Sequence, residues 1–226
     1  MSSRTLIAES LTPDQERLTL TLEEGHHVVR VRGELLMSSR ISGSEEALAK
    51  LALSDSAAGV APRVLVGGLG IGFTLRAVLD ELGPTSQIDV LELLEAVVDW
   101  NRGPLAAHAG KPLDDPRVSV IVNDVLAHLA AVNRRYDAII LDIDNGPEAF
   151  TVKANGRLYT PAGLATLHAA LRPGGVMVLW SAFRSPDFER RLRGAGFSVT
   201  TETVRARGAV RKGARHTVFR ALRPRS

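Results

Sequence analysis

The chain has no cysteine among its 226 residues. This absence excludes disulfides, iron–sulfur clusters and zinc held by thiolates, and it is compatible with a reducing compartment. No apolar run approaches the roughly 18 residues of a membrane-spanning helix. The start of the chain mixes Arg4 and Glu9 with short apolar stretches and lacks the core of a signal peptide. We therefore expect a cytoplasmic protein with no membrane association.

Two further absences narrow the chemistry. The sequence has no Gly-Lys-Ser/Thr motif, which argues against nucleoside triphosphate hydrolysis. Its six histidines show no ligand spacing, and the adjacent His26 and His27 would point to opposite faces of a strand. We expect no metal site.

Positive charge is unevenly distributed along the chain. Residues 201–226 carry eight Lys or Arg against one acid, Glu202, whereas the remainder has 20 basic and 24 acidic residues. Such a tail could contact phosphates or a membrane surface, but we favour a solvated strand pair whose arginines face water. A nucleic-acid methyltransferase is a further alternative. No aromatic stacking platform is evident for it, so nucleic acid is not expected as a partner.

The N-terminal part of the chain is predicted to be mainly β-structure. Residues 17–22 alternate polar and apolar side chains, and residues 27–32 do so less regularly. Ser44 is a suitable N-cap for a helix that follows it. We therefore divide the chain into an N-terminal β appendage with this helix, residues 1–54, and a larger cofactor-binding domain, residues 55–226.

Strand and helix patterns alternate through the larger domain. This alternation predicts a doubly wound, Rossmann-like α/β fold, in which helices cover both faces of a mostly parallel seven-stranded sheet. No helix pattern separates the last two strands, so they should form an antiparallel hairpin at one edge. The predicted strands are 63–67, 87–92, 117–122, 136–142, 174–180, 196–204 and 215–222, and the predicted helices are 72–82, 95–108, 124–132, 161–171 and 186–194.

Glycines and polar side chains follow four of these strands. Closely spaced glycines let a ligand approach the backbone next to a helix N-terminus. A carboxylate at the tip of the next strand can bind ribose hydroxyls. Because ligands bind at the carboxyl ends of parallel strands, the pattern predicts a nucleoside cofactor site. The expected cofactor-binding residues are Gly68, Gly70, Gly72, Glu92, Asn123 and Asp124, and the fourth tip carries Asp142.

Each of these residues has a simpler interpretation. A glycine turn occurs in many folds, Glu92 could be a surface carboxylate, and Asp124 could cap the following helix with or without binding a ligand. Asp142 follows an apolar strand, where a buried charge needs a partner. The glycines alone would also suit a nicotinamide enzyme. Asp124 and the terminal hairpin favour an S-adenosylmethionine-type cofactor.

Several motifs together resemble the polyamine aminopropyltransferase (spermidine synthase) family, with its methyltransferase offshoot, putrescine N-methyltransferase. The similarity spans roughly residues 27–180. It implies S-adenosylmethionine or its decarboxylated form as the cofactor, a small-molecule amine as the acceptor, and a homodimer. The matching segments are Gly68-Leu69-Gly70-Ile71-Gly72, Leu91-Glu92-Leu93-Leu94, Asp115-Pro116-Arg117-Val118, Asp124, Tyr136-Asp137-Ala138-Ile139-Ile140-Leu141-Asp142 and Leu171-Arg172-Pro173-Gly174-Gly175.

The sequence also departs from the pattern of this family. The loop aspartate that holds the amino group of decarboxylated S-adenosylmethionine is replaced by Ile71, and the gate pair Tyr-Gln by Ser44 and Glu45. Loss of a charge-assisted bond, on the order of 1.5–3 kcal/mol, weakens the preference for the decarboxylated cofactor. We therefore expect an alkyl transferase that favours methyl over aminopropyl transfer. The alternatives are an aminopropyltransferase proper and a cofactor-binding module without catalysis.

Candidate roles follow for the remaining pocket residues. Asp142 is the expected catalytic carboxylate, which accepts or orients the proton of the attacking amine. Asp144 and Glu45 could hold a distant cationic group of the substrate. Tyr159 and Trp180 could wall the substrate pocket, although ordinary core packing explains aromatic residues equally well.

Overall fold

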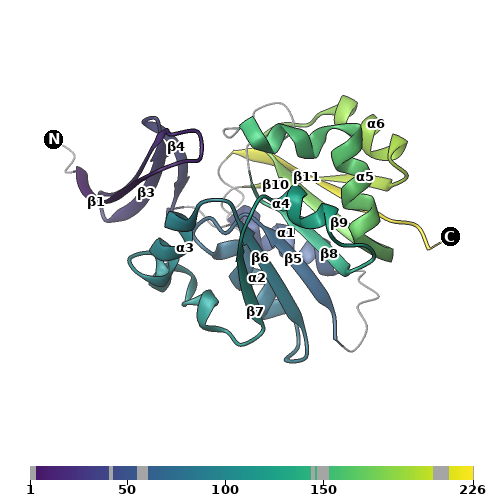
Figure 1. The fold of residues 1–226 in the computed structure, drawn as a ribbon, viewed down its shortest axis with the longest axis horizontal. Helices are drawn as coiled ribbons and strands as arrows, with labels where there is room; N and C mark the ends of the chain where they lie inside the picture. Colours follow the sequence, from purple (N-terminus) through teal and green to yellow (C-terminus); the bar gives the residue numbers. More distant parts are fainter. Residues whose placement is uncertain are drawn as a thin grey trace.

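A computed structural model describes residues 4–40, 43–54, 61–143, 146, 153–205 and 214–225, with only the backbone described at 153–155. Within these residues the strands form two separate sheets. A four-stranded N-terminal sheet lies beside the larger α/β part of the molecule (Figure 1). None of the helices in the described segments is long and apolar enough to cross a membrane.

The N-terminal sheet is an antiparallel meander in the order β1-β2-β3-β4. Leu18 and Leu20 of the second strand and Val29 and Val31 of the third alternate along their strands and join the apolar core. The two strands read from the sequence are confirmed, and a further strand flanks them on each side. The strands are β1 (Arg4–Leu11), β2 (Arg17–Glu23), β3 (His26–Val31) and β4 (Glu34–Ser38).

The larger sheet has seven strands in the order β10-β11-β9-β8-β5-β6-β7. Five strands are parallel, and β11 pairs antiparallel with both β9 and β10. The predicted fold class, with its antiparallel edge hairpin, is confirmed. The strands are β5 (Arg63–Gly67), β6 (Gln87–Glu92), β7 (Val118–Val122), β8 (Tyr136–Leu141), β9 (Leu171–Ser181), β10 (Ser198–Arg205) and β11 (Arg215–Leu222).

Helices connect these strands, and some end earlier than the sequence predicts. The helix expected to reach residue 108 ends at Arg102, because Gly103 follows and the chain continues as 3₁₀ turns. The α-helices are α1 (Gly43–Leu53), α2 (Phe73–Glu81), α3 (Glu95–Arg102), α4 (Val125–Ala130), α5 (Pro161–Ala170) and α6 (Pro186–Gly194). The 3₁₀ helices are η1 (Ala106–Ala109), η2 (Pro112–Asp114) and η3 (Lys153–Tyr159).

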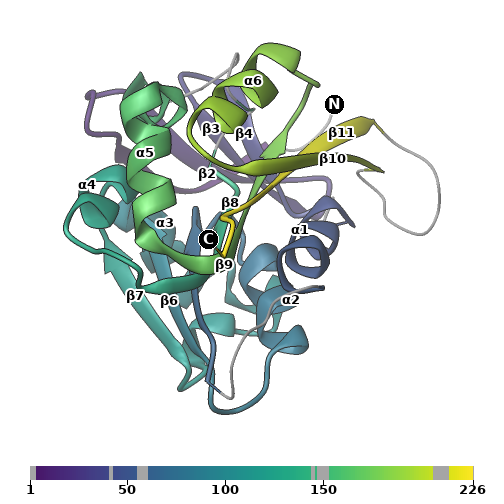
Figure 2. The same ribbon diagram turned by 90° about the vertical axis from the view of Figure 1, so that its right-hand side faces the viewer.

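Both faces of the larger sheet are buried. Side chains alternate along β5, so that Val64 and Val66 enter one apolar cluster and Leu65 enters the other. The first cluster includes residues of α1, α2 and α3 together with β2 and β3, and the second includes residues of α4, α5 and α6. Figure 2 shows α1 and α2 on one side of the sheet and α5 and α6 on the other.

Helix α1 packs against the larger sheet. It contacts α2 and strands β8 and β9. Near its C-terminus, the carbonyl of Leu51 accepts a hydrogen bond from Arg220 Nε on β11 at 3.0 Å. Its N-terminal residues Ser44 and Glu45 reach the pocket described below.

The strand order reverses between β5 and β8. The chain runs from β5 to β6 and β7 on one side, then returns to place β8 on the other. Ligands of open α/β sheets bind at such a switch point, beyond the carboxyl ends of the strands. Gly67 pairs with Leu141 there, so the next residues, Gly68 and Asp142, lie side by side.

Candidate functional site

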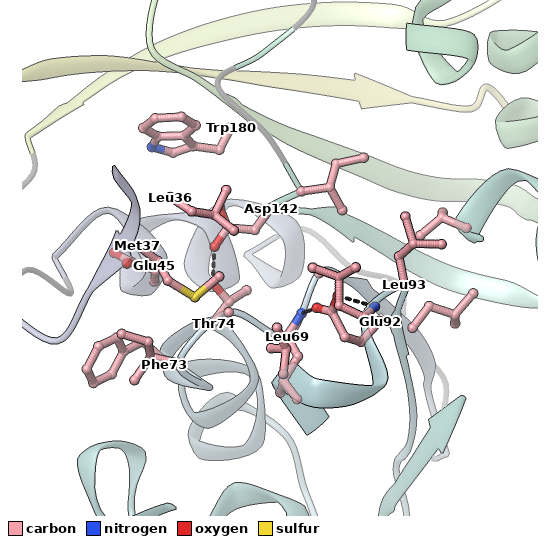
Figure 3. Close-up of a pocket in the computed structure, with 18 of the residues that line it drawn as sticks. Leu36, Met37, Glu45, Leu69, Phe73, Thr74, Glu92, Leu93, Asp142 and Trp180 are labelled. Atoms are coloured by element: carbon pink, nitrogen blue, oxygen red, sulfur yellow. Dashed lines mark hydrogen bonds between the residues drawn. The ribbon is translucent and has the colours of Figure 1, made fainter. Parts of the chain in front are cut away.

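A pocket of about 370 Å³ lies at this switch point. Its walls come from β4, the N-terminus of α1, the loop between β5 and α2, and the tips of five further strands. Figure 3 shows side chains from these segments directed toward a common space. The lining includes every predicted cofactor-binding residue, namely Gly68, Gly70, Glu92, Asn123 and Asp124, except Gly72, which begins the adjacent helix.

The glycine loop adopts a conformation that suits glycine. Gly68, Gly70 and Gly72 have φ angles of 88°, 56° and 88°. A Cβ on Gly68 would lie 2.3 Å from the carbonyl oxygen of Asp142. Gly72 is the N-cap of α2 and provides no side-chain acceptor, so the first N–H groups of that helix remain available for a ligand.

Glu92 holds the loop in place. Its Oε2 accepts from the backbone N–H of Leu69 at 3.0 Å, and its Oε1 accepts from the N–H of Leu94 at 2.9 Å. Burial raises the pKa of this carboxyl above its ordinary value, against the opposing effect of the backbone donors. A carboxylate oxygen can accept more than one hydrogen bond. Glu92 can therefore still accept the predicted hydrogen bonds from ribose hydroxyls.

Asp124 caps α4, as one of the alternatives from the sequence anticipated. Its Oδ1 accepts from Ala127 N–H at 2.8 Å, and its Oδ2 accepts from Arg157 Nη2 at 3.3 Å. Asn123 Oδ1 accepts from the backbone N–H of Asp124 at 2.8 Å. Both residues line the pocket, so capping and ligand binding are compatible at this tip.

Asp142 and Glu45 enter the pocket from different elements. Asp142 follows β8, and its Oδ2 accepts from Thr74 Oγ1 at 2.7 Å (Figure 3). Burial raises the pKa of Asp142. Glu45 lies in the first turn of α1 and accepts from Ser44 Oγ at 2.8 Å. Burial, together with the negative charge of Asp142, raises the pKa of Glu45 to about 7.

The aromatic predictions have different outcomes. Trp180 lines the pocket from the end of β9, and its ring meets that of His216 edge to face at 4.7 Å between centroids. Tyr159 is not among the residues that line this pocket, and the alternative of core packing describes its surroundings. It is 3% exposed in the second apolar cluster, because η3 turns it against Phe188, with ring centroids 5.7 Å apart. Asp144 lies outside the described residues.

Several lining residues were not predicted from the sequence. Thr74 could have been suspected, because it follows the glycine loop in the first turn of a helix. His216 carries no motif, and only the pairing of β11 with β9 brings it to the pocket. Leu36, Met37 and Phe73 add an apolar wall beside Glu45 (Figure 3).

A seven-stranded Rossmann-like sheet with a glycine loop and acids at successive strand tips defines the class of nucleoside-cofactor-binding proteins. The family model for the spermine/spermidine synthase domain matches residues 43–192. The chain therefore belongs to the spermidine synthase family.

Known relatives and solved structures agree with this assignment. A polyamine aminopropyltransferase of Mycobacterium tuberculosis is 35% identical over 164 residues, which cover 69% of this chain and 30% of that protein. One from Korarchaeum cryptofilum is 31% identical over 119 residues, covering 53% and 35%. The chain thus matches about a third of the length of these curated relatives. The crystal structure of spermidine synthase from Thermotoga maritima superimposes with a TM-score of 0.76 at 18% identity, covering 98% of this chain and 74% of that one, which supports the fold.

Proposed function

We propose that the protein transfers an aminopropyl group from decarboxylated S-adenosylmethionine to a small-molecule amine. One observation carries this proposal. The charged residues that line the pocket are four acids, Glu45, Glu92, Asp124 and Asp142, and no Lys or Arg is among the described lining residues. A pocket of this charge suits a cationic sulfonium and a cationic amine. The relatives named polyamine aminopropyltransferases support the same reaction.

This proposal reverses the preference for methyl transfer that was drawn from Ile71. That preference considered the loss of one loop carboxylate only. Ile71 is 4% exposed, whereas Glu45 and Asp142 bring carboxyl groups into the pocket from α1 and β8. The negative charge missing from the loop is therefore present on neighbouring elements.

The order of the strand tips suggests how the reactants lie. Asp124 and Glu92 follow β7 and β6, on one side of the glycine loop, and suit the adenosine part of the cofactor. Asp142 and Trp180 belong to β8 and β9, on the other side. The acceptor amine would enter there, next to the apolar side chains of β4. Asp142 is the residue that we assign to the reacting nitrogen.

The chemistry requires alignment and one proton acceptor. When bound, the sulfonium supplies an electrophilic carbon and leaves as a neutral thioether. The protein must hold the attacking nitrogen in line with the carbon–sulfur bond that breaks. As the new carbon–nitrogen bond forms, Asp142 can take the proton that the nitrogen loses. The neutral hydrogen bond from Thr74 fixes the orientation of this carboxyl group.

Product mass tests the proposed reaction. The purified protein is incubated with a panel of diamines and monoamines, and with each of the two cofactors in turn. We expect products that have gained an aminopropyl group, with the decarboxylated cofactor only. A product that has gained a methyl group from S-adenosylmethionine would overturn the proposal. Cofactor binding without product from any amine would instead favour the non-catalytic module.

Assembly and location are part of the same proposal. Membership of the family supports a homodimer and a cytoplasmic enzyme. Light scattering at several protein concentrations would test the dimer, because a monomer mass throughout would contradict it.

A further inference from the structure

Two of the four acids in the pocket, Glu45 and Asp142, have a hydroxyl group as their side-chain donor and no charged partner among the described residues. Glu92 is held by two backbone N–H groups, and Asp124 is held by a backbone N–H and by Arg157. By contrast, Asp142 accepts from the Thr74 hydroxyl, and Glu45 accepts from the Ser44 hydroxyl. Within the described residues no salt bridge includes either Glu45 or Asp142.

These two carboxyl groups form one electrostatic unit. They come from the N-terminus of α1 and the carboxyl end of β8, which contact each other, and both face the same pocket (Figure 3). Burial raises the pKa of Glu45, and the negative charge of Asp142 raises it further. Two partly desolvated carboxylates repel each other unless one is protonated or a cation lies between them. The pair is therefore suited to a ligand that brings its own positive charge.

The position of the pair indicates which part of a ligand it meets. Asp142 lies next to Gly68, on the opposite side of the glycine loop from Glu92 and Asp124. The loop itself contributes the apolar Ile71. A side chain that extends from the sulfur of an adenosyl group bound at Glu92 would thus meet Glu45 and Asp142 as its nearest charges.

We propose that Glu45, acting together with Asp142, selects the form of the cofactor by the charge of this side chain. The pair accepts a chain that ends in an ammonium group alone, and it repels the carboxylate that S-adenosylmethionine carries beside its ammonium. The inference rests on the proposed function for the identity of the ligand. It assigns cofactor selection to a helix outside the glycine loop.

Calorimetric binding to three ligands separates this role from general support of the pocket. The ligands are decarboxylated S-adenosylmethionine, S-adenosylmethionine, and methylthioadenosine, which has no charged side chain. Glu45→Gln keeps the size of the side chain and removes its charge. Glu46→Gln is the matched control, because Glu46 is exposed on the next position of α1 and does not line the pocket. A charge-assisted hydrogen bond corresponds to a factor of about ten or more in affinity.

We expect Glu45→Gln to reduce the preference for the decarboxylated cofactor over S-adenosylmethionine by about tenfold or more. Affinity for methylthioadenosine should stay within about twofold of wild type, Glu46→Gln should leave all three affinities unchanged, and Glu45→Asp should restore part of the preference. An unchanged preference in Glu45→Gln, or an equal loss for all three ligands, would overturn the inference. Binding is measured without an acceptor, so failure of the transfer reaction gives a different result from failure of cofactor selection.

Discussion

At the scale of single residues, the pocket depends on how carboxyl groups are partnered. Glu92 is satisfied by backbone donors, and Asp124 by a helix end and an arginine. Asp142 is satisfied by one hydroxyl, that of Thr74, among the hydrogen bonds of the described residues. A buried carboxyl group with a neutral partner retains the capacity to exchange a proton. Glu92 also has neutral partners, but its two backbone bonds hold the glycine loop, whereas Asp142 lies on the side of the loop assigned to the acceptor amine. We therefore assign structural support to Glu92 and proton transfer to Asp142.

Replacing Asp142 tests this assignment. Asp142→Asn keeps the shape of the side chain and an oxygen that can accept from Thr74, but it cannot take a proton. General acid–base groups typically contribute about 10²–10⁴ to a rate, so we expect turnover to fall by at least about 100-fold. Affinity for methylthioadenosine should be retained. Steady-state kinetics and calorimetry measure the two quantities, and unchanged turnover would exclude a catalytic role for Asp142.

The ionisation of Glu45 should make stability depend on pH in the unliganded protein. Its pKa rises from 4.5 to about 7 on folding, so the folded state binds this proton more tightly than the unfolded state. The resulting stabilisation is fully present below pH 4.5 and is lost as the pH rises through 7. The glutamine of Glu45→Gln cannot ionise, so the variant does not share this loss of stability. The melting temperature of the variant minus that of wild type should therefore increase between about pH 5 and pH 8.

Thermal melts of Glu45→Gln, Glu46→Gln and wild type across this pH range provide the measurement. Glu46→Gln should follow wild type, because Glu46 is exposed. A constant difference between Glu45→Gln and wild type at all pH values would show that Glu45 titrates with the same pKa in the folded and unfolded states.

Pocket residues at the carboxyl ends of strands could be predicted from the sequence. Glu92, Asp124 and Asp142 could be identified because an apolar run reveals the strand and its last residue, and parallel tips share one edge. Their partners were not predictable in the same way. The bonds from Thr74 to Asp142 and from Leu69 to Glu92 join residues 68 and 23 positions apart, and only the folded chain defines them.

At the scale of elements, the connection between β5 and α2 is the most constrained part of the site. Gly68 combines a φ of +88° with the carbonyl of Asp142 at 2.3 Å from the place of a Cβ. Any side chain there must distort either the loop or the strand tip that carries the proposed catalytic acid. Stability and activity are therefore coupled at this position.

Alanine substitutions at Gly68 and at a second glycine can be compared. The comparison separates the cost of backbone strain from the cost of steric crowding. Gly25 has a similar φ of +81°, but no atom lies within 4 Å of the place of its Cβ. We expect Gly25→Ala to cost about 1 kcal/mol, from backbone strain alone. Gly68→Ala should cost on the order of 2–4 kcal/mol, since crowding adds to the strain. Denaturant unfolding measures the loss of stability in both variants. Equal losses would mean that the end of β8 moves to accommodate the added methyl group at little cost.

The types of the main elements could be predicted from the sequence, and several of their ends could not. The predicted helix 161–171 is observed as α5, which ends at Ala170, and β9 begins at Leu171, before the start of the predicted strand 174–180. Pairing with β8 extends the strand, with an irregular register between Tyr136 and Ala138. Tertiary hydrogen bonding outweighs local preference at such positions.

At the scale of the whole molecule, the two sheets share one apolar core. Leu18, Leu20, Val29 and Val31 of the N-terminal sheet belong to the same cluster as residues of the larger sheet and of α1 and α2. The division at residues 54 and 55 stays a prediction from composition. A shared core favours unfolding of both parts in a single transition.

A cavity in the N-terminal sheet should therefore destabilise the complete chain. Leu20 is fully buried, and Leu20→Ala should cost about 2–5 kcal/mol. We expect one calorimetric transition that shifts as a unit to lower temperature. Leu6→Ala is the matched control on the same sheet, because Leu6 is 50% exposed and should change stability little. Two resolved transitions, with only one shifted by Leu20→Ala, would show that the appendage folds independently.

The hydrogen bond from Arg220 to Leu51 connects strand β11 with helix α1. It ties β11 to the helix whose opposite end presents Glu45, and the same strand supplies His216 to the pocket wall. Removal of residues 215–225 by a protease would thus affect ligand recognition in two ways, by taking away one support of α1 and by opening the pocket wall. Strand β11 therefore contributes to ligand recognition both as part of the pocket wall and as a support of α1.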